Sequence, residues 1–237
     1  MTIIFGLLSA FSYGLADFVG ALAAKKIRAL AVTAISFSFG LVIALVLSQV
    51  LGATYSAETI QTSIYAGISS AIAISCLYAA LALGPISIVS PLTAVISAMI
   101  PVIVDVASGQ ALSGFAVFAV VLILVAVVLV GFVPGEKVTL PSLPALIYSL
   151  GAGLGFAGIF VFLDATSKDS GLGPLVVMRA VGLSLLILGL GYLAIKNKVP
   201  FIEKSAFEIK TLTLILVAGA GDVLGNVAFL IATREGA

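Results

Sequence analysis

The sequence predicts an all-α membrane protein, a multi-pass helical bundle of two inverted five-helix repeats whose second repeat is incomplete. Hydrophobic residues make up 62% of the 237 positions and charged residues 9%, which is too little polar surface to cover a soluble globule. Apolar segments of about 20 residues recur along the chain, and each is long enough to cross a hydrocarbon core of roughly 30 Å as a helix. One hydrophobic pattern also occurs twice.

Eight apolar segments are predicted to be membrane-spanning helices. They cover residues 3–24, 29–51, 60–83, 86–107, 113–133, 143–165, 172–195 and 211–233. The first contains Asp17 and lacks the basic start and the cleavage site of a signal peptide, so we expect it to remain in the membrane.

Turn-forming residues separate these segments. Lys25, Lys26 and Arg28 follow the first helix, and Gly84-Pro85 follows the third. The sequence Pro134-Gly135-Glu136-Lys137 follows the fifth and separates the two copies of the pattern. The polar residues 196–210 are expected to form the loop between the seventh and eighth helices.

The internal repeat defines two units, residues 1–134 with five helices and residues 141–237 with three. A shift of about 152 positions aligns Ala66, Gly67, Ala80 and Gly84 with Ala218, Gly219, Ala232 and Gly236. A shift of about 139 aligns Leu7, Gly14 and Leu15 with Leu146, Gly153 and Leu154. Because five is odd, the second unit enters the membrane from the opposite side, as in the inverted repeats of many secondary transporters. We expect the second unit to lack its last two helices.

Lys and Arg residues outside the apolar segments are distributed unevenly. Two, Lys168 and Arg234, lie on the side reached by even-numbered helices. The others lie on the opposite side: Lys25, Lys26, Arg28, Lys137, Lys196, Lys198, Lys204 and Lys210. This bias predicts that the N-terminus is outside the cell.

Composition excludes several functional classes. A net charge of +1 argues against a nucleic-acid partner, and Cys76 is the single cysteine, so no intrachain disulfide forms. The chain has no histidine and no G-x-x-x-x-G-K-[ST] loop, which excludes Ser-His catalysis, histidine metal sites and direct use of ATP. We expect no cofactor, no metal site and no enzymatic activity.

Asp17, Arg179 and Asp222 are the ionisable residues deepest within apolar segments. Each costs about 2.5–3.5 kcal/mol near a helix centre, so each needs a partner or a wet cavity. Helical spacing places Tyr13 on the same face as Asp17, and Asn226 and Phe229 on the same face as Asp222. Ser75 and Tyr78 form a weaker polar stripe on the third helix. In one interpretation these faces line one cavity, with Asp17 or Asp222 as a proton or cation site and Arg179 as counter-ion or anion-binding group. In the other, Arg179 and one aspartate form a structural pair.

Other polar and turn-forming residues receive simpler interpretations. Asp105 and Asp164 are expected to reach the membrane surface from helix ends. The glycines near 151–158 and 219–225 are expected to mark close helix contacts. Pro91 and Pro101 either bend the fourth helix around a cavity or are tolerated there.

Gly219-Ala220-Gly221-Asp222 matches the G-x-G-D pattern of intramembrane aspartyl proteases. That chemistry needs a second carboxylate sharing a proton, which those proteases carry in a Tyr-Asp pair. This chain has no Tyr-Asp dipeptide, and Asp17 is the best-placed second aspartate. A protease is therefore a remote alternative.

Six segments of the chain form a recognisable set: Tyr13 to Gly20, Leu77 to Pro85, the segment from Pro91 to Pro101, Leu163-Asp164-Ala165, Pro174 to Arg179 and Ala218 to Asn226. Together they resemble the EamA-type transporters of the drug/metabolite transporter superfamily. The resemblance covers the whole chain and implies ten helices in two inverted repeats, with export of small metabolites or drugs by alternating access.

Three features depart from that family. Gly109-Gln110 stands where the family usually has Gly-Glu, the ninth and tenth helices are absent, and the family usually keeps both termini in the cytoplasm. The last point opposes the charge bias, so the orientation stays open between the two.

The sequence therefore predicts a multi-pass transporter of the cell membrane, the inner or plasma membrane, that exports or exchanges a small organic solute. Its partners are the lipid bilayer, that solute and, as a candidate coupling ion, the proton. The alternative is an inactive partial product or a membrane interaction protein without a closed pathway. The substrate and the oligomeric state are not indicated.

Overall fold

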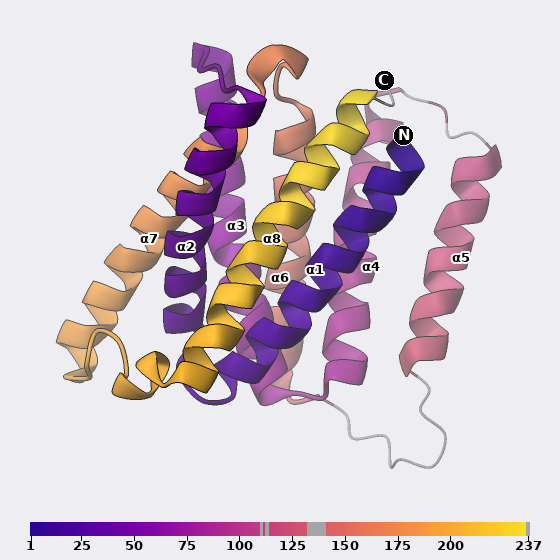
Figure 1. Cartoon of the computed structure of the whole chain (residues 1–237). Helices are drawn as coiled ribbons and strands as arrows, with labels where there is room; N and C mark the ends of the chain where they lie inside the picture. Colours follow the sequence, from indigo (N-terminus) through magenta and orange to yellow (C-terminus); the bar gives the residue numbers. More distant parts are fainter. Residues whose placement is uncertain (110, 112–113, 132–140, 236–237) are drawn as a thin grey trace.

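The computed structural model describes residues 1–109, 111, 114–131 and 141–235, and the long elements within them are helices (Figure 1). The expected all-α class is confirmed. The helices are α1 (Thr2–Ala24), α2 (Ala29–Leu51), α3 (Ala57–Leu83), α4 (Ile86–Ala107), α5 (Gly114–Gly131), α6 (Leu143–Asp164), α7 (Gly173–Asn197) and α8 (Ile209–Glu235), with short 3-10 helices η1 (Lys168–Ser170) and η2 (Lys204–Phe207).

Seven of the described helices are long and apolar enough to cross a membrane, so the chain is a multi-pass membrane protein. In α5 the described apolar stretch, Val117–Ala126, is shorter, and the expected span at 113–133 stays a prediction. The segment 134–137, Gln110 and residues 236–237 lie outside the described residues.

Several helix boundaries differ from the prediction by a few residues. Helix α3 begins at Ala57 and not at residue 60, because the Ser56 side chain caps it by accepting a hydrogen bond from the Thr59 amide at 3.1 Å. The expected loop at 196–210 is shorter, since α7 continues to Asn197 and η2 forms within it.

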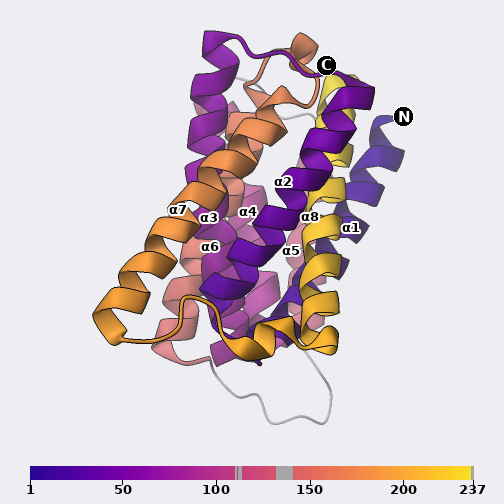
Figure 2. The same ribbon diagram turned by 60° about the vertical axis from the view of Figure 1, so that its left-hand side comes forward.

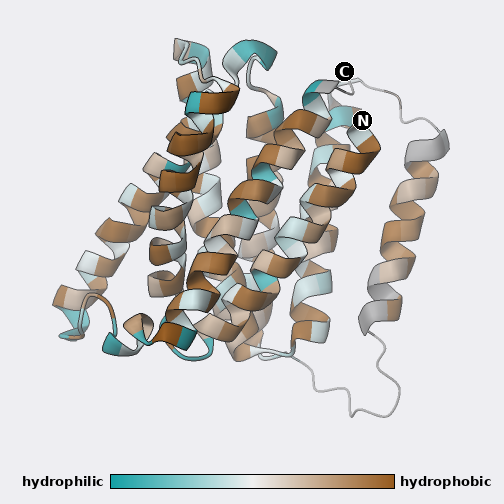
Figure 3. Cartoon of the chain, viewed as in Figure 1, coloured by the Kyte–Doolittle hydropathy of each residue, from teal (hydrophilic) through white to brown (hydrophobic). Residues whose placement is uncertain are grey.

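Successive helices run in alternating directions, so both termini lie at one end of the bundle (Figure 1). The loops after α1 and α7 meet at the other end, where Arg28 forms an ion pair with Glu203 and donates to the Phe201 carbonyl at 3.1 Å. Hydrophobic residues dominate the helices between the two ends, while hydrophilic residues gather at the loops (Figure 3).

Two long antiparallel pairs organise the bundle: α1 packs along α8, and α3 packs along α6. Helices α2 and α7 pack against each other, α2 also against α8, and α7 also against α3 (Figure 2). Helix α4 packs on α6, and α5 packs on α4. Only Val89 and Thr93 of α4 are buried, so far less of α4 than of α3 lies inside the bundle.

The glycines expected at close helix contacts lie there. A Cβ added at Gly155 would fall 2.7 Å from the Ala73 Cα of α3, and one at Gly219 would fall 2.7 Å from the Ser36 carbonyl oxygen of α2. A Cβ at Gly67 would lie 2.9 Å from the Met178 carbonyl oxygen. Small residues therefore allow the helix backbones to approach closely, as membrane bundles require.

Hydrogen bonds join the α2–α3 and α6–α7 loops at the end that carries the termini. The Leu172 amide donates to the Gly52 carbonyl at 2.9 Å, and the Thr54 amide donates to the Ser170 carbonyl at 3.0 Å. From the last turn of α8, Arg234 Nη2 donates to the Ser170 hydroxyl at 2.9 Å. We call this set of contacts the end clamp.

Candidate functional site

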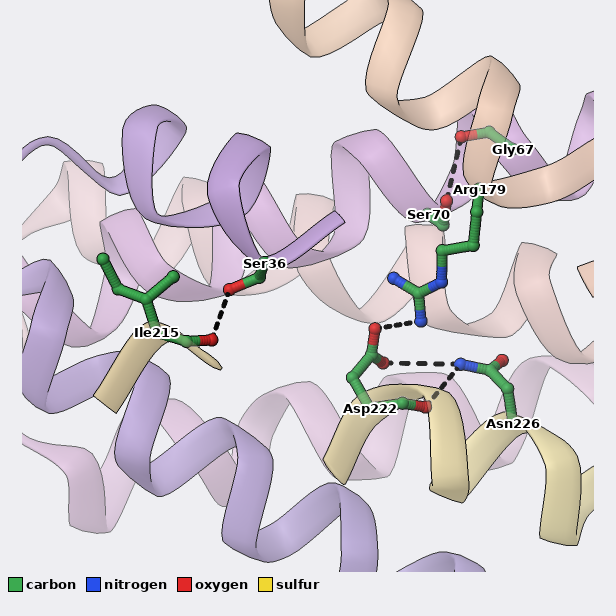
Figure 4. A network of polar contacts seen from close by, with 7 residues as sticks. All are labelled: Ser36, Gly67, Ser70, Arg179, Ile215, Asp222 and Asn226. Atoms are coloured by element: carbon green, nitrogen blue, oxygen red, sulfur yellow. Dashed lines mark hydrogen bonds and ion pairs between the residues drawn. The ribbon is translucent and has the colours of Figure 1, made fainter. Parts of the chain in front are cut away.

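A buried ion pair joins α7 and α8 in the middle of the bundle (Figure 4). Arg179 Nη2 donates to Asp222 Oδ2, and the two residues are 1% and 6% exposed. One turn further along α8, Asn226 Nδ2 donates to the Asp222 carbonyl at 2.8 Å and reaches its Oδ1 at 3.4 Å. Both oxygens of the carboxylate are therefore engaged by side chains.

Helix α2 contributes part of the pair's surroundings. The guanidinium carbon of Arg179 lies 4.4 Å from the centroid of the Phe37 ring, a cation–π contact. Gly40 makes room beside it, since an added Cβ would fall 2.9 Å from the Val223 side chain. The Ser36 hydroxyl donates to the Ile215 carbonyl at 3.2 Å and ties α2 to α8 nearby (Figure 4).

Hydrogen-bonding capacity remains at this pair. Nε and Nη1 of Arg179, and Oδ1 of Asn226, are buried and have no hydrogen-bond partner within the described residues. None of these residues lines the cavities described below. The ion pair links α7 to α8.

Asp17 of α1 has different surroundings. It lines a cavity of about 130 Å³ between α1, α3, α4 and α6, together with Tyr13, Leu77, Ser90, Thr93, Ala94, Ser97, Phe156 and Phe160. Within the part of the chain that the structure describes, its carboxylate has no hydrogen bond and no ion pair. An intramembrane carboxylate without a partner thus faces a small, partly polar space.

Two tyrosines lie near Asp17, Tyr13 one turn earlier on α1 and Tyr78 on α3. The ring of Tyr13 lies against Gly225, where an added Cβ would be 2.9 Å away, and its hydroxyl oxygen is buried without a partner among the described residues. Tyr78 is 1% exposed, and its hydroxyl fills the space beside Gly20, 2.1 Å from an added Cβ. Tyr13 therefore offers the cavity a free hydroxyl, and Tyr78 is a packing residue of the α1–α3 contact.

A larger cavity of about 370 Å³ lies between α4, α6 and α8 and shares Ser97 and Phe160 with the Asp17 cavity. Pro101, Asp105, Asp164 and Phe229 line it too. A third cavity, also about 370 Å³, separates α4 from α5 and includes Pro91. Each proline of α4 therefore borders a cavity.

The residues proposed from sequence divide into three groups. Arg179, Asp222 and Asn226 meet in the ion pair, while Tyr13, Asp17 and Phe229 line cavities. Ser75 and Tyr78 line none of the described cavities.

Sequence reasoning missed several cavity residues. Thr93 and Ser97 of α4 and Phe160 of α6 line the Asp17 cavity. Spacing along the sequence did not indicate that these residues of two helices face the same cavity. Asp105 and Asp164 lie at helix ends as expected, and both also line the larger cavity.

No protein-family model matches this chain, and no curated protein matches it.

Proposed function

We propose that the chain is a membrane transporter of the EamA type that exports or exchanges a small organic solute by alternating access, with Asp17 at its solute or proton site. The observation that carries the proposal is the unpartnered Asp17 carboxylate in a cavity between four helices. Ionisable residues inside a membrane are costly and usually mark a substrate, ion or proton pathway. Asp222 is less suited to that role because Arg179 neutralises it.

Helix packing supports an inverted repeat. Under the sequence correspondence, α1 matches α6, α2 matches α7 and α3 matches α8. If the two units are equivalent, a contact between α1 and α8 should be matched by one between α6 and α3, and a contact between α2 and α8 by one between α7 and α3. All four contacts occur. The Asp17 cavity draws helices from both units, as expected for a site between repeats.

The test is solute flux through the Asp17→Asn variant. A growth screen of an overexpressing strain against toxic metabolites and drugs identifies a transported solute, whose flux is then measured in proteoliposomes. We expect Asp17→Asn to reduce flux at least about tenfold, corresponding to about 1.4 kcal/mol. Glu58→Gln, an exposed carboxylate in the first turn of α3 that borders none of the described cavities, is the control. Unchanged flux in Asp17→Asn would refute the assignment.

One observation favours the second candidate, a membrane interaction protein or inactive form. An added Cβ at Gly153 of α6 would lie 2.5 Å from Ile96 of α4, whereas its counterpart Gly14 of α1 has no atom within 4 Å. The described structure thus has no wall on the α1 side equivalent to α4. A folded chain that moves no solute in the screen would favour this candidate.

The protease alternative is less well supported. An aspartyl protease needs two carboxylates that share a proton beside a water molecule. Asp222 instead accepts hydrogen bonds from Arg179 and Asn226. We therefore do not propose an enzymatic activity.

A further inference from the structure

The cavity between α4, α6 and α8 carries one sign of charge. Asp105, at the end of α4, and Asp164, at the end of α6, line it, and no lysine or arginine is among its described lining residues. Lys168 of η1 interacts electrostatically with Asp164 from outside the lining. Both aspartates are exposed, and the C-terminal ends of α4 and α6 that carry them lie at the end of the bundle with the termini (Figure 1).

The same cavity has an aromatic wall. The rings of Phe160 and Phe229 lie 4.9 Å apart between centroids and tilt by 39°. Phe160 also borders the inner cavity, where Tyr13 meets it edge-on at 6.2 Å. Aromatic faces beside carboxylates attract cations, because the ring quadrupole and the negative charge act in the same direction.

The inner cavity continues this pattern. Its one charged lining residue among those described is Asp17, and the Tyr13 hydroxyl is buried without a partner there. The buried cation Arg179 is held by Asp222 and lines neither cavity. Within the described residues no three His, Cys, Asp or Glu side chains gather closely enough to hold a metal ion.

We infer that the two cavities bind an organic monocation: a protonated amine or quaternary ammonium attached to an apolar or aromatic body. The ammonium group lies between Asp105 and Asp164 on entry and at Asp17 when fully inserted, and the apolar body contacts Phe160 and Phe229. The inference rests on the proposed transport function for its direction of movement, but binding alone tests the site.

The experiment uses three probes with the same aromatic body: 2-(1-naphthyl)ethylammonium, 2-(1-naphthyl)ethanol and 1-naphthylacetate. Equilibrium dialysis measures their binding to the full chain in lipid nanodiscs, with empty nanodiscs as background. We expect the ammonium probe to bind at least about tenfold more tightly than the alcohol, and the carboxylate probe to bind most weakly.

Variants locate the binding. The double variant Asp105→Asn/Asp164→Asn should weaken ammonium binding about three- to tenfold and leave alcohol binding unchanged. Phe229→Leu should weaken it by a smaller factor, because it removes the aromatic ring and keeps an apolar side chain. Glu58→Gln, an exposed carboxylate in the first turn of α3 that borders none of the described cavities, should have no effect.

Equal binding of the ammonium and alcohol probes, or equal losses in the double variant and in Glu58→Gln, would overturn the inference. Ammonium binding that depends on the two aspartates without flux in proteoliposomes would keep the cation site and refute the transport function. If a neutral or anionic solute is transported in an Asp17-dependent way and the ammonium probe does not bind, the transport function is kept and the cation site is refuted.

Discussion

Asp17 and Asp222 are chemically identical residues whose surroundings give them different roles. Asp222 accepts hydrogen bonds from Arg179 and Asn226, while Asp17 faces a cavity without a partner among the described residues. Helical spacing predicted the Asp222–Asn226 neighbourhood because both residues lie on one helix. It could not assign Arg179 to one of the two aspartates, because that partner lies 43 residues away on another helix.

The buried ion pair leads to a stability prediction. Arg179→Met should lower the free energy of unfolding by about 3–5 kcal/mol, because it leaves the Asp222 carboxylate buried without a counter-charge. Adding Asp222→Asn should restore part of the loss, since the remaining amide carries no charge. Denaturant titration in detergent micelles measures both variants. If the double variant is as unstable as Arg179→Met, the pair is not the source of the loss.

At the scale of helices, the sequence predicted which residues lie at helix contacts better than it predicted which helices they contact. Glycine spacing predicted that α6 and α8 have close neighbours, and Gly155 and Gly219 confirm it. Asp105 and Asp164 were correctly placed at helix ends, but their position along a helix does not reveal that the ends of α4 and α6 border one cavity. Such meetings depend on long-range packing, which one-dimensional patterns do not contain.

Gly155 and Gly14 offer a matched test of helix packing. Gly155→Ala places a methyl group 2.7 Å from the Ala73 backbone, and overpacking of this kind costs about 1–3 kcal/mol. Gly14→Ala meets no atom within 4 Å, so it should be neutral or stabilising by up to about 1 kcal/mol. Thermal unfolding in detergent compares the two, and equal shifts would mean that the α3–α6 contact is looser than described.

For the whole molecule, hydropathy identified the spanning helices because a chain in lipid must satisfy its backbone hydrogen bonds within each segment. The lateral arrangement was less accessible, because apolar faces do not select among apolar neighbours.

Membrane orientation is a property of the whole molecule and is tested by labelling. In a Cys76→Ala background, Asp169→Cys in η1 and Lys204→Cys in η2 place single thiols at exposed positions on opposite ends. The bias of basic residues predicts that an impermeant maleimide labels Asp169→Cys on intact cells and Lys204→Cys only after permeabilisation. The opposite result would support the orientation that the family resemblance implies.

The end clamp has a mechanical consequence. It ties the α2–α3 turn of the first unit to the α6–α7 turn of the second through Thr54, Ser170 and Leu172, and Arg234 fastens α8 to the same point. Separating the two hairpins there would break several hydrogen bonds at once. The clamp therefore holds the ends of α2, α7 and α8 together at a single point of the bundle.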